Sequence, residues 1–241
     1  MRYAIIFLGI LCFSCSVDKE VLSGTLEAAI NETAIVRDNI IACAASNVND
    51  DRTSVFLYPR VGATNIRYFE TRSATSDKND FSEYDEYDVN PQDVFNGYLK
   101  KIETRVEEGA WVIVTFEEDD KVHLCNPIRI KKDSKPTEVL NDGITITNSR
   151  MPTFSWPEGI YDDTIIYFQV VSDANDNLLS GTYTEDRTFQ YYNTINVVLN
   201  VTRETPPELE YNLDYNFTLM GVSEDNWVNL FVEIPFVLEE D

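Results

Sequence analysis

The 241-residue chain has little positive charge. It contains 19 lysines and arginines against 42 aspartates and glutamates, and its formal net charge is −23. Proteins that bind nucleic acid or anionic membrane surfaces need Lys and Arg to replace the counterions of phosphate groups. The composition therefore excludes nucleic acid as a partner. It also means that charge does not attract this chain to a bilayer.

Residue types that commonly carry catalysis are also scarce. His123 is the only histidine, and the one CxxC, Cys12-Phe13-Ser14-Cys15, lies in the apolar N-terminal segment, so we expect no metal centre in the body of the chain. The chain has no G-x-S-x-G or H-E-x-x-H motif, and its nine glycines form no phosphate-binding loop. We therefore expect a protein that is not an enzyme and has no cofactor. A carboxylate-dependent hydrolase remains an alternative, because such an enzyme needs only two suitably spaced carboxyl groups.

The N-terminus holds the apolar run that is most informative about location. It extends from Tyr3 to Phe13, follows Met1-Arg2, and ends at Ser14-Cys15. A transmembrane helix needs about 20 apolar residues, so this run is too short to span a bilayer. A positive start, a short apolar core and a small residue at the end are typical of a secretory signal peptide.

The residues MRYAIIFLGILCFSC resemble the signal peptide and lipobox of bacterial lipoproteins, in particular those of Bacteroidota. The resemblance implies that Cys15 carries acyl chains such as palmitate and becomes the first mature residue. Asp18-Lys19-Glu20 resembles the acidic signal that sends such lipoproteins to the cell surface. The implied location is the outer membrane. The alternatives are retention on its periplasmic face and an ordinary signal cleaved near Ser14 or Ser16.

The mature chain reads as two β-rich halves. WVIVTF, an acidic turn and VHLC predict a hairpin in the first half, and the second half contains MPTFSW and IIYFQVV. Strand-like segments recur about every ten residues with turn residues between them, which is typical of β-sandwiches. Phe154 and Trp156 lie two residues apart, so they should share one face of a strand.

These segments carry a second resemblance. WVIVTFEEDDKVHLCNPIRIK and TLMGVSEDNWVNLFVEIPF resemble the closing hairpins of immunoglobulin-like and fibronectin type III modules, and MPTFSWPE resembles the start of one. The expected fold is all-β, with two tandem sandwiches of this kind. The expected boundaries are a signal peptide at 1–15, a polar tether at 16–34 with a short helix around 26–30, a first domain at 35–132, a linker at 133–142 and a second domain at 143–241.

Two cysteines remain in the body of the chain. Cys12 lies in the signal peptide and Cys15 is the lipidation candidate, which leaves Cys43 and Cys125. A secreted protein occupies an oxidising compartment, where a pair of cysteines can form a disulfide. The alternative is two buried free thiols.

One turn has the spacing of a weak calcium candidate. Asp173, Asn175 and Asn177 place oxygen-bearing side chains at alternate positions, as in the first half of a calcium-binding loop. The glycine expected at the sixth position is replaced by Leu178. The alternative is an Asx-rich hairpin turn without a metal.

Aromatic residues supply the candidate contacts with a partner. Tyr84 and Tyr87 lie in the polar acidic segment 73–93, and Trp227 lies in the late hairpin. Exposed rings bind sugars or proteins, whereas buried rings would hold the segment to a sheet. We expect a lipid-anchored envelope protein that binds an envelope protein or has a structural role. The alternative is a glycan-binding accessory lipoprotein of a polysaccharide uptake system.

Overall fold

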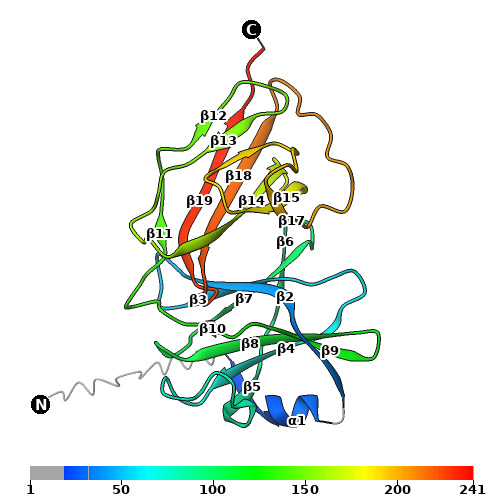
Figure 1. Cartoon of the computed structure of the whole chain (residues 1–241), viewed down its shortest axis with the longest axis vertical. Helices are drawn as coiled ribbons and strands as arrows, with labels where there is room; N and C mark the ends of the chain where they lie inside the picture. Colours follow the sequence, from blue (N-terminus) through cyan, green and yellow to red (C-terminus); the bar gives the residue numbers. More distant parts are fainter. Residues whose placement is uncertain (1–18, 32, 241) are drawn as a thin grey trace, which may run out of the picture.

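The computed structural model describes residues 19–31 and 33–240, so the signal peptide and Cys15 lie outside the described residues. Two β-rich modules are stacked along the long axis of the molecule (Figure 1). Each module is a β-sandwich, which confirms the expected all-β sandwich fold. No helix within the described residues has both the length and the apolar character needed to cross a membrane.

The first module holds the N-terminal strands and both short helices. Its elements are β1 (Glu20–Thr25), α1 (Leu26–Ile30), β2 (Ala34–Ser46), β3 (Thr53–Tyr58), β4 (Thr64–Thr71), η1 (Phe81–Glu83), β5 (Tyr84–Asp88), β6 (Gln92–Val94), β7 (Leu99–Thr104), β8 (Trp111–Glu118), β9 (Lys121–Cys125) and β10 (Ile128–Arg129). The strand order is β1-β5-β4-β8-β9-β2-β3-β7-β6, and β10 pairs with β8.

Strand β2 belongs to both layers of this sandwich. Its first part pairs in parallel with β9, and its second part, from Ile41 to Ser46, pairs antiparallel with β3. In Figure 1 the layer of β3 and β7 lies above the layer of β8, β4 and β9, and β2 crosses between them. The single hydrogen-bonded path therefore closes over a core between the layers.

The described part of the predicted tether is not a tether. β1 pairs with β5, and Leu26 of α1 is fully buried in the first core. The helix expected at 26–30 is confirmed, with the Thr25 hydroxyl accepting a hydrogen bond from the Ala28 amide at 3.2 Å. The polar segment 73–93 is also ordered, because it contains η1, β5 and most of β6. Sequence polarity was misleading in both places because these strands are short and half exposed.

The second module has two sheets. Its elements are β11 (Glu138–Val139), β12 (Thr145–Ile146), β13 (Thr153–Ser155), β14 (Thr164–Asp173), β15 (Leu178–Thr184), β16 (Thr188–Gln190), β17 (Val197–Asn200), β18 (Asp214–Ser223) and β19 (Val228–Val237). One sheet has the order β11-β19-β18-β14-β15-β17, and the other has the order β12-β13-β16. Phe154 and Trp156 share the core between them, as predicted, and the Phe154 ring stacks on Phe217 with centroids 4.2 Å apart.

A third apolar core joins the modules, and we call it the interface core. From the first module it includes Ala45, Phe95 and Leu99, and from the second it includes Phe168 and Met220, among others. The face of β2 that points away from its own core packs against the outer face of the β14–β18 sheet. The central parts of β2 and β14 are therefore buried on two faces, which explains the continuous apolar run of each strand.

The predicted linker is fixed to both modules. The Thr137 hydroxyl accepts a hydrogen bond from the Ser46 amide at 2.9 Å and donates one to the Val228 carbonyl at 2.9 Å. The Thr137 amide donates to the Ser46 hydroxyl at 2.8 Å. β11, which lies within 133–142, pairs in parallel with β19. The two modules are thus held in one arrangement by apolar packing and by the hydrogen bonds of the linker.

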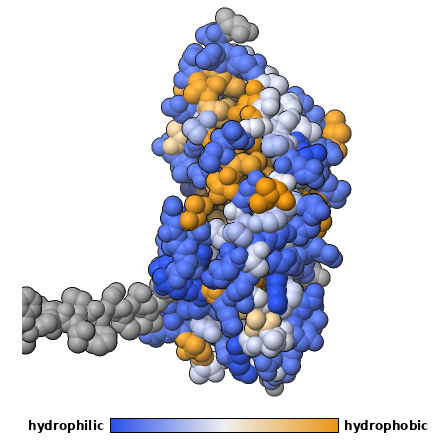
Figure 2. Space-filling view, turned by 90° about the vertical axis from the view of Figure 1, so that its left-hand side faces the viewer, coloured by the Kyte–Doolittle hydropathy of each residue, from blue (hydrophilic) through white to orange (hydrophobic). Residues whose placement is uncertain are grey.

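The surface shows a difference between the modules. On the face in Figure 2, apolar residues cover more of the upper part of the molecule, which is the second module, than of the lower part. Exposed aliphatic side chains of the second module include Ile160, Ile165 and Ile195. The first module is covered mainly by polar groups on this face, as the charge of the chain leads one to expect.

Candidate binding site at the junction of the modules

A cleft of about 680 Å³ lies where the two modules meet, and we call it the junction cleft. The first module contributes β2, β8, β9 and the loop before η1. The second module contributes the start of β14 and the turn between β18 and β19. Ligand sites favour domain interfaces and have volumes of roughly 300–1,000 Å³. The position and size of the junction cleft therefore suit a ligand site.

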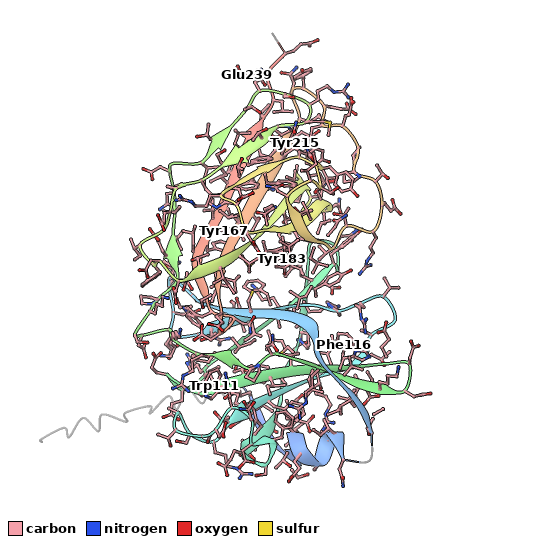
Figure 3. All side chains as sticks on the ribbon, viewed as in Figure 1. Trp111, Phe116, Tyr167, Tyr183, Tyr215 and Glu239 are labelled. Atoms are coloured by element: carbon pink, nitrogen blue, oxygen red, sulfur yellow. The ribbon has the colours of Figure 1, made fainter. Side chains whose placement is uncertain are left out.

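The first-module wall carries cations packed on aromatic rings. The Arg37 guanidinium lies 4.7 Å from the centroid of the Phe81 ring. The Trp111 ring has the Lys78 ammonium at 5.3 Å and the Arg129 guanidinium at 4.8 Å from its centroid. Figure 3 shows Trp111 at one end of β8. The rings attract these cations and hold them in place, while their N–H groups stay available to a ligand.

These three cations are unusual in such an acidic chain. Most of the described lysines and arginines pair with a carboxylate, as Arg67 does with Glu86 at 2.6 Å. Within residues 19–31 and 33–240, Arg37, Lys78 and Arg129 form no such pair. Arg37 and Lys78 line the junction cleft and are therefore available to an anionic group of a ligand, whereas Arg129 only packs on the Trp111 ring.

The second-module wall is acidic. Asp163 hydrogen-bonds Lys135, and Asp225 pairs with Lys131 at 2.5 Å. Burial raises the pKa of Asp163, but its hydrogen bonds, led by that from Lys135, lower the pKa by more. Glu224 is exposed and has no cationic partner in the described part of the chain. The junction cleft therefore has a cationic wall and an acidic wall.

Three amide side chains lie between these charged groups. Asn79, Asn126 and Asn226 all line the junction cleft. Each amide supplies two donors and an acceptor, a combination that suits ligand hydroxyl groups. The cleft thus combines cations, aromatic edges and neutral hydrogen-bonding groups.

The turn between β18 and β19 is attached to the first module. The Ala44 amide donates to the Asn226 carbonyl at 3.0 Å, and the Arg129 amide donates to the Asp225 carbonyl at 3.0 Å. Asn226 has a φ of 59°, a left-handed conformation that Asn tolerates better than most residues. These bonds fix the acidic wall relative to the cationic wall.

Two of the three aromatic residues predicted to contact a partner are buried in the protein. Tyr84 is fully buried, and its hydroxyl donates to the Lys78 carbonyl at 2.8 Å, so the prediction that it contacts a ligand is wrong. Trp227 is also fully buried and cannot be a surface contact. Tyr87 is half-buried, with the Lys19 ammonium 4.4 Å from its ring centroid. Tyr84 serves the junction cleft indirectly, because it holds the main chain that carries Lys78.

The residues of the calcium candidate form the turn between β14 and β15. Asp173 Oδ1 accepts hydrogen bonds from the Asn175 and Asn177 amides at 2.8 and 2.9 Å, and Oδ2 accepts one from Asn177 Nδ2 at 2.8 Å. Both carboxylate oxygens therefore stabilise the turn. In the described chain no three His, Cys, Asp or Glu residues form a group that could hold a metal ion. The geometry favours the alternative of a metal-free Asx turn.

The two cysteines of the body are free thiols, which corrects the disulfide prediction. Cys43 packs against the interface core, while Cys125 lies in the core of the first module. Alternate residues of β2 point to opposite faces, so Cys43 faces the second module and not the first core, which contains Cys125. Both side chains are thiols, as in the alternative, but only Cys125 is buried and Cys43 is partly buried. Burial raises the pKa of the Cys43 thiol to about 12.

Sequence reasoning missed the junction cleft. Arg37, Lys78 and Trp111 lie on three separate elements, and no local motif joins them. The available signal was the placement of Lys78 and Arg129 near predicted strands in a chain with so few cations. That signal does not show which side chain Lys78 and Arg129 contact. Only the fold places both beside the Trp111 ring.

Comparison with models of known protein families gives no match, and neither does comparison with curated proteins. Among solved structures, the chain is similar to the FN1–FN3 domains of chicken CNTN1, with 13% identity and a TM-score of 0.32, covering 86% of this chain and 69% of that chain. It is also similar to the Spr0440 glycoside hydrolase domain, Endo-D, of Streptococcus pneumoniae R6, with 9% identity and a TM-score of 0.31, covering 83% of this chain and 33% of that one. These TM-scores are too low to carry an argument about function.

Proposed function

We propose that this protein is a non-catalytic, lipid-anchored binding protein of the cell envelope, and that the junction cleft captures an acidic oligosaccharide. The observation that carries the ligand proposal is the pair of cations Arg37 and Lys78, which line the cleft and have no carboxylate partner in the described chain. Carboxylate or sulfate groups on a sugar chain would be their counterpart.

The other cleft groups favour a sugar over a simple anion. The asparagine amides can bond hydroxyl groups, and the exposed Glu224 can accept hydrogen bonds from them. Trp111 and Phe81, whose ring faces hold the cations, offer apolar ring edges to the C–H groups of a sugar. A phosphate or sulfate ion alone would use only the cationic wall.

The proposed anchor rests on the sequence of the N-terminus, and the described chain begins a few residues after it. Lys19 bonds Glu70, and its ammonium also lies over the Tyr87 ring. Only three residues separate Lys19 from Cys15, and the four Cα–Cα steps between them reach at most about 14 Å. An acyl chain on Cys15 would therefore hold the first module close to the outer membrane. The acidic surface would not bind the bilayer by itself.

Mass spectrometry of the mature N-terminus in its host tests the anchor. We expect acylated Cys15 as the first residue and loss of membrane association in Cys15→Ala. A mature chain that begins elsewhere or lacks acyl groups would contradict the proposal. Protease digestion of intact cells would remove a surface-exposed chain and spare one on the periplasmic face.

Calorimetric titration with oligogalacturonate tests the ligand. We expect saturable binding that weakens with salt and falls about tenfold in Lys78→Gln, because one charge-assisted hydrogen bond is lost. Lys121→Gln is the matched control, since Lys121 is exposed and lies outside the cleft.

Equal loss of oligogalacturonate affinity in Lys78→Gln and Lys121→Gln would contradict the junction cleft as the site. The same mixtures, examined by chain length after incubation, report on catalysis. Shortened oligosaccharides would favour the carboxylate-dependent hydrolase over a binding protein.

A further inference from the structure

A second cavity of about 680 Å³ follows the edge of the interface core, and we call it the interface groove. It lies between β3, β6 and β7 of the first module and β18 and β19 of the second. It shares no lining residue with the junction cleft.

The floor of the interface groove is apolar. Phe95 and Met220 are buried there, whereas Phe56, Val94 and Phe231 remain partly exposed. The sheets that meet in the interface core separate here, so part of their apolar surface faces solvent. Val48, in the loop between β2 and β3, is 71% exposed at this groove and adds to that surface. Contact with an apolar partner would remove this surface from water.

The rim of the interface groove is acidic on both sides. Its ionisable residues are Asp50, Asp93, Glu103, Asp176, Glu233 and Lys101. The single cation among them, Lys101, pairs with Glu103 at 2.9 Å. Glu233 is exposed and has no cationic partner in the described residues. Asp93 pairs with Lys100, which lies outside the groove, so the net negative charge beside the apolar floor comes from Asp50, Asp176 and Glu233.

We propose that the interface groove binds an extended, cationic polypeptide segment in which lysine or arginine alternates with apolar residues. In an extended chain, alternate side chains point to opposite sides, so apolar residues can face the floor while cations face the carboxylates. Asn49, Asn96 and Asn175 line the groove and supply partners for a peptide main chain. A second copy of this chain is a poor occupant, because its net charge of −23 would repel the rim.

Calorimetric titration of the purified chain tests the groove. The probes are the blocked peptides Lys-Val-Lys-Phe-Lys, Glu-Val-Glu-Phe-Glu and Lys-Gly-Lys-Gly-Lys, together with spermine. We expect only the first peptide to bind with clear saturation. We expect its affinity to fall about tenfold in Glu233→Lys and severalfold in Val48→Ser, because the first loses charge complementarity and the second apolar contact. Both replaced side chains are exposed, so folding should be unaffected.

Glu204→Lys is the matched charge-reversal control, because Glu204 is exposed and outside the groove. We expect it to change the affinity less than twofold. Three results would overturn the proposal. They are equal weakening by Glu204→Lys and Glu233→Lys, equal binding of the glycine-containing peptide, and equal binding of spermine. Since Lys78→Gln should leave peptide binding intact, failure here is distinguishable from failure of the oligosaccharide proposal.

Discussion

Trp227 comes from the second module but packs in the core of the first. Its side chain is fully buried, and its indole N–H donates to the Lys135 carbonyl of the linker at 2.7 Å. Ala44 forms an isolated parallel bridge with it. One side chain thus connects the first core, the linker and the last hairpin.

Replacing Trp227 with alanine should lower the free energy of unfolding by about 3–5 kcal/mol, because a large cavity opens at the junction. Urea denaturation checks this. Trp111→Ala is the matched control. The Trp111 ring is only half-buried, so its removal should lower the free energy of unfolding by less. An equal cost for the two variants would contradict the role assigned to Trp227.

Lys19 and Glu70 form a mostly buried ion pair at the start of the described chain. Burial raises the pKa of Glu70 above its ordinary value of 4.5, although Lys19 opposes the shift. Burial also lowers the pKa of Lys19, which its attraction to Glu70 opposes. Relative to the unfolded chain, the fold therefore favours the neutral form of Glu70. The stability contributed by this group is full below pH 4.5 and declines as pH rises through its folded-state pKa.

Lys19→Met removes the opposing charge, so the pKa of Glu70 should rise further. We expect the variant to lose up to about 3 kcal/mol at pH 8 and much less at pH 5. Urea denaturation at both pH values measures this. In Lys19→Met/Glu70→Gln the difference from wild type should be small and nearly independent of pH. A pH-independent loss in the single variant would contradict the interpretation.

At the scale of single elements, β2 and β14 show how much of the fold follows from sequence pattern. Their apolar runs predict strands, and both are strands. The pattern does not say what covers each face. Alternation along β2 sends Ala42 and Ala44 into the first core, while Cys43 and Ala45 face the second module. The second-module residues that cover Cys43 and Ala45 lie far away in sequence, so only the fold brings them to this face of β2.

The short elements were harder to predict. β1 and β5 contain mainly polar residues, and each is stabilised by pairing with the other and by the residues beneath them. Pairing between segments distant in sequence is not encoded in local composition. The tether prediction failed for this reason, whereas α1 was predictable from its local apolar pattern and small residues.

Asp173 organises the turn between β14 and β15, and its variants test the calcium alternative. Burial raises the pKa of Asp173, but hydrogen bonds from Asn177 and Asn175 lower it below 3.8 overall. Its contribution is therefore present above pH 3.8 and lost as pH falls through the lower folded-state pKa.

We expect Asp173→Ala to cost about 1 kcal/mol at pH 7, since it removes hydrogen bonds to the turn. Thermal melting should show the difference from wild type narrowing toward pH 3. Millimolar calcium chloride should leave the melting temperature of wild type unchanged. A rise with calcium that Asp173→Ala abolishes would instead show a metal site.

At the scale of the whole molecule, three apolar cores share strands and side chains. Trp227 joins the first core to the second module, and the interface core joins the outer faces of two sheets. Figure 3 places Tyr183, whose ring stacks on Phe168 with centroids 4.5 Å apart, at the side of the second module nearest the first. Separating the modules would expose all of this surface, so we expect them to unfold together.

Cys43 reports on this cooperativity. Its raised pKa and its packing against the interface core should slow alkylation by iodoacetamide at pH 8 in the native state, because the thiolate is the reactive form. We expect labelling, mapped by peptide mass spectrometry, to follow the unfolding transition measured by circular dichroism. Labelling of Cys43 before that transition would show that the modules separate first. A peptide linking Cys43 to Cys125 would contradict the free thiols.

The sequence by itself determined the all-β class, the division into two β-rich halves, the acidic surface and the signal-like N-terminus, because each depends on composition or on periodicity over a few residues. The tertiary structure alone decided how the halves are joined and which side chains meet. Arg37, Lys78 and Trp111 form one wall of the junction cleft only because β2, the loop before η1 and β8 pack together. Such contacts join residues far apart in the chain, and their free energy comes from burial and pairing that no local pattern specifies.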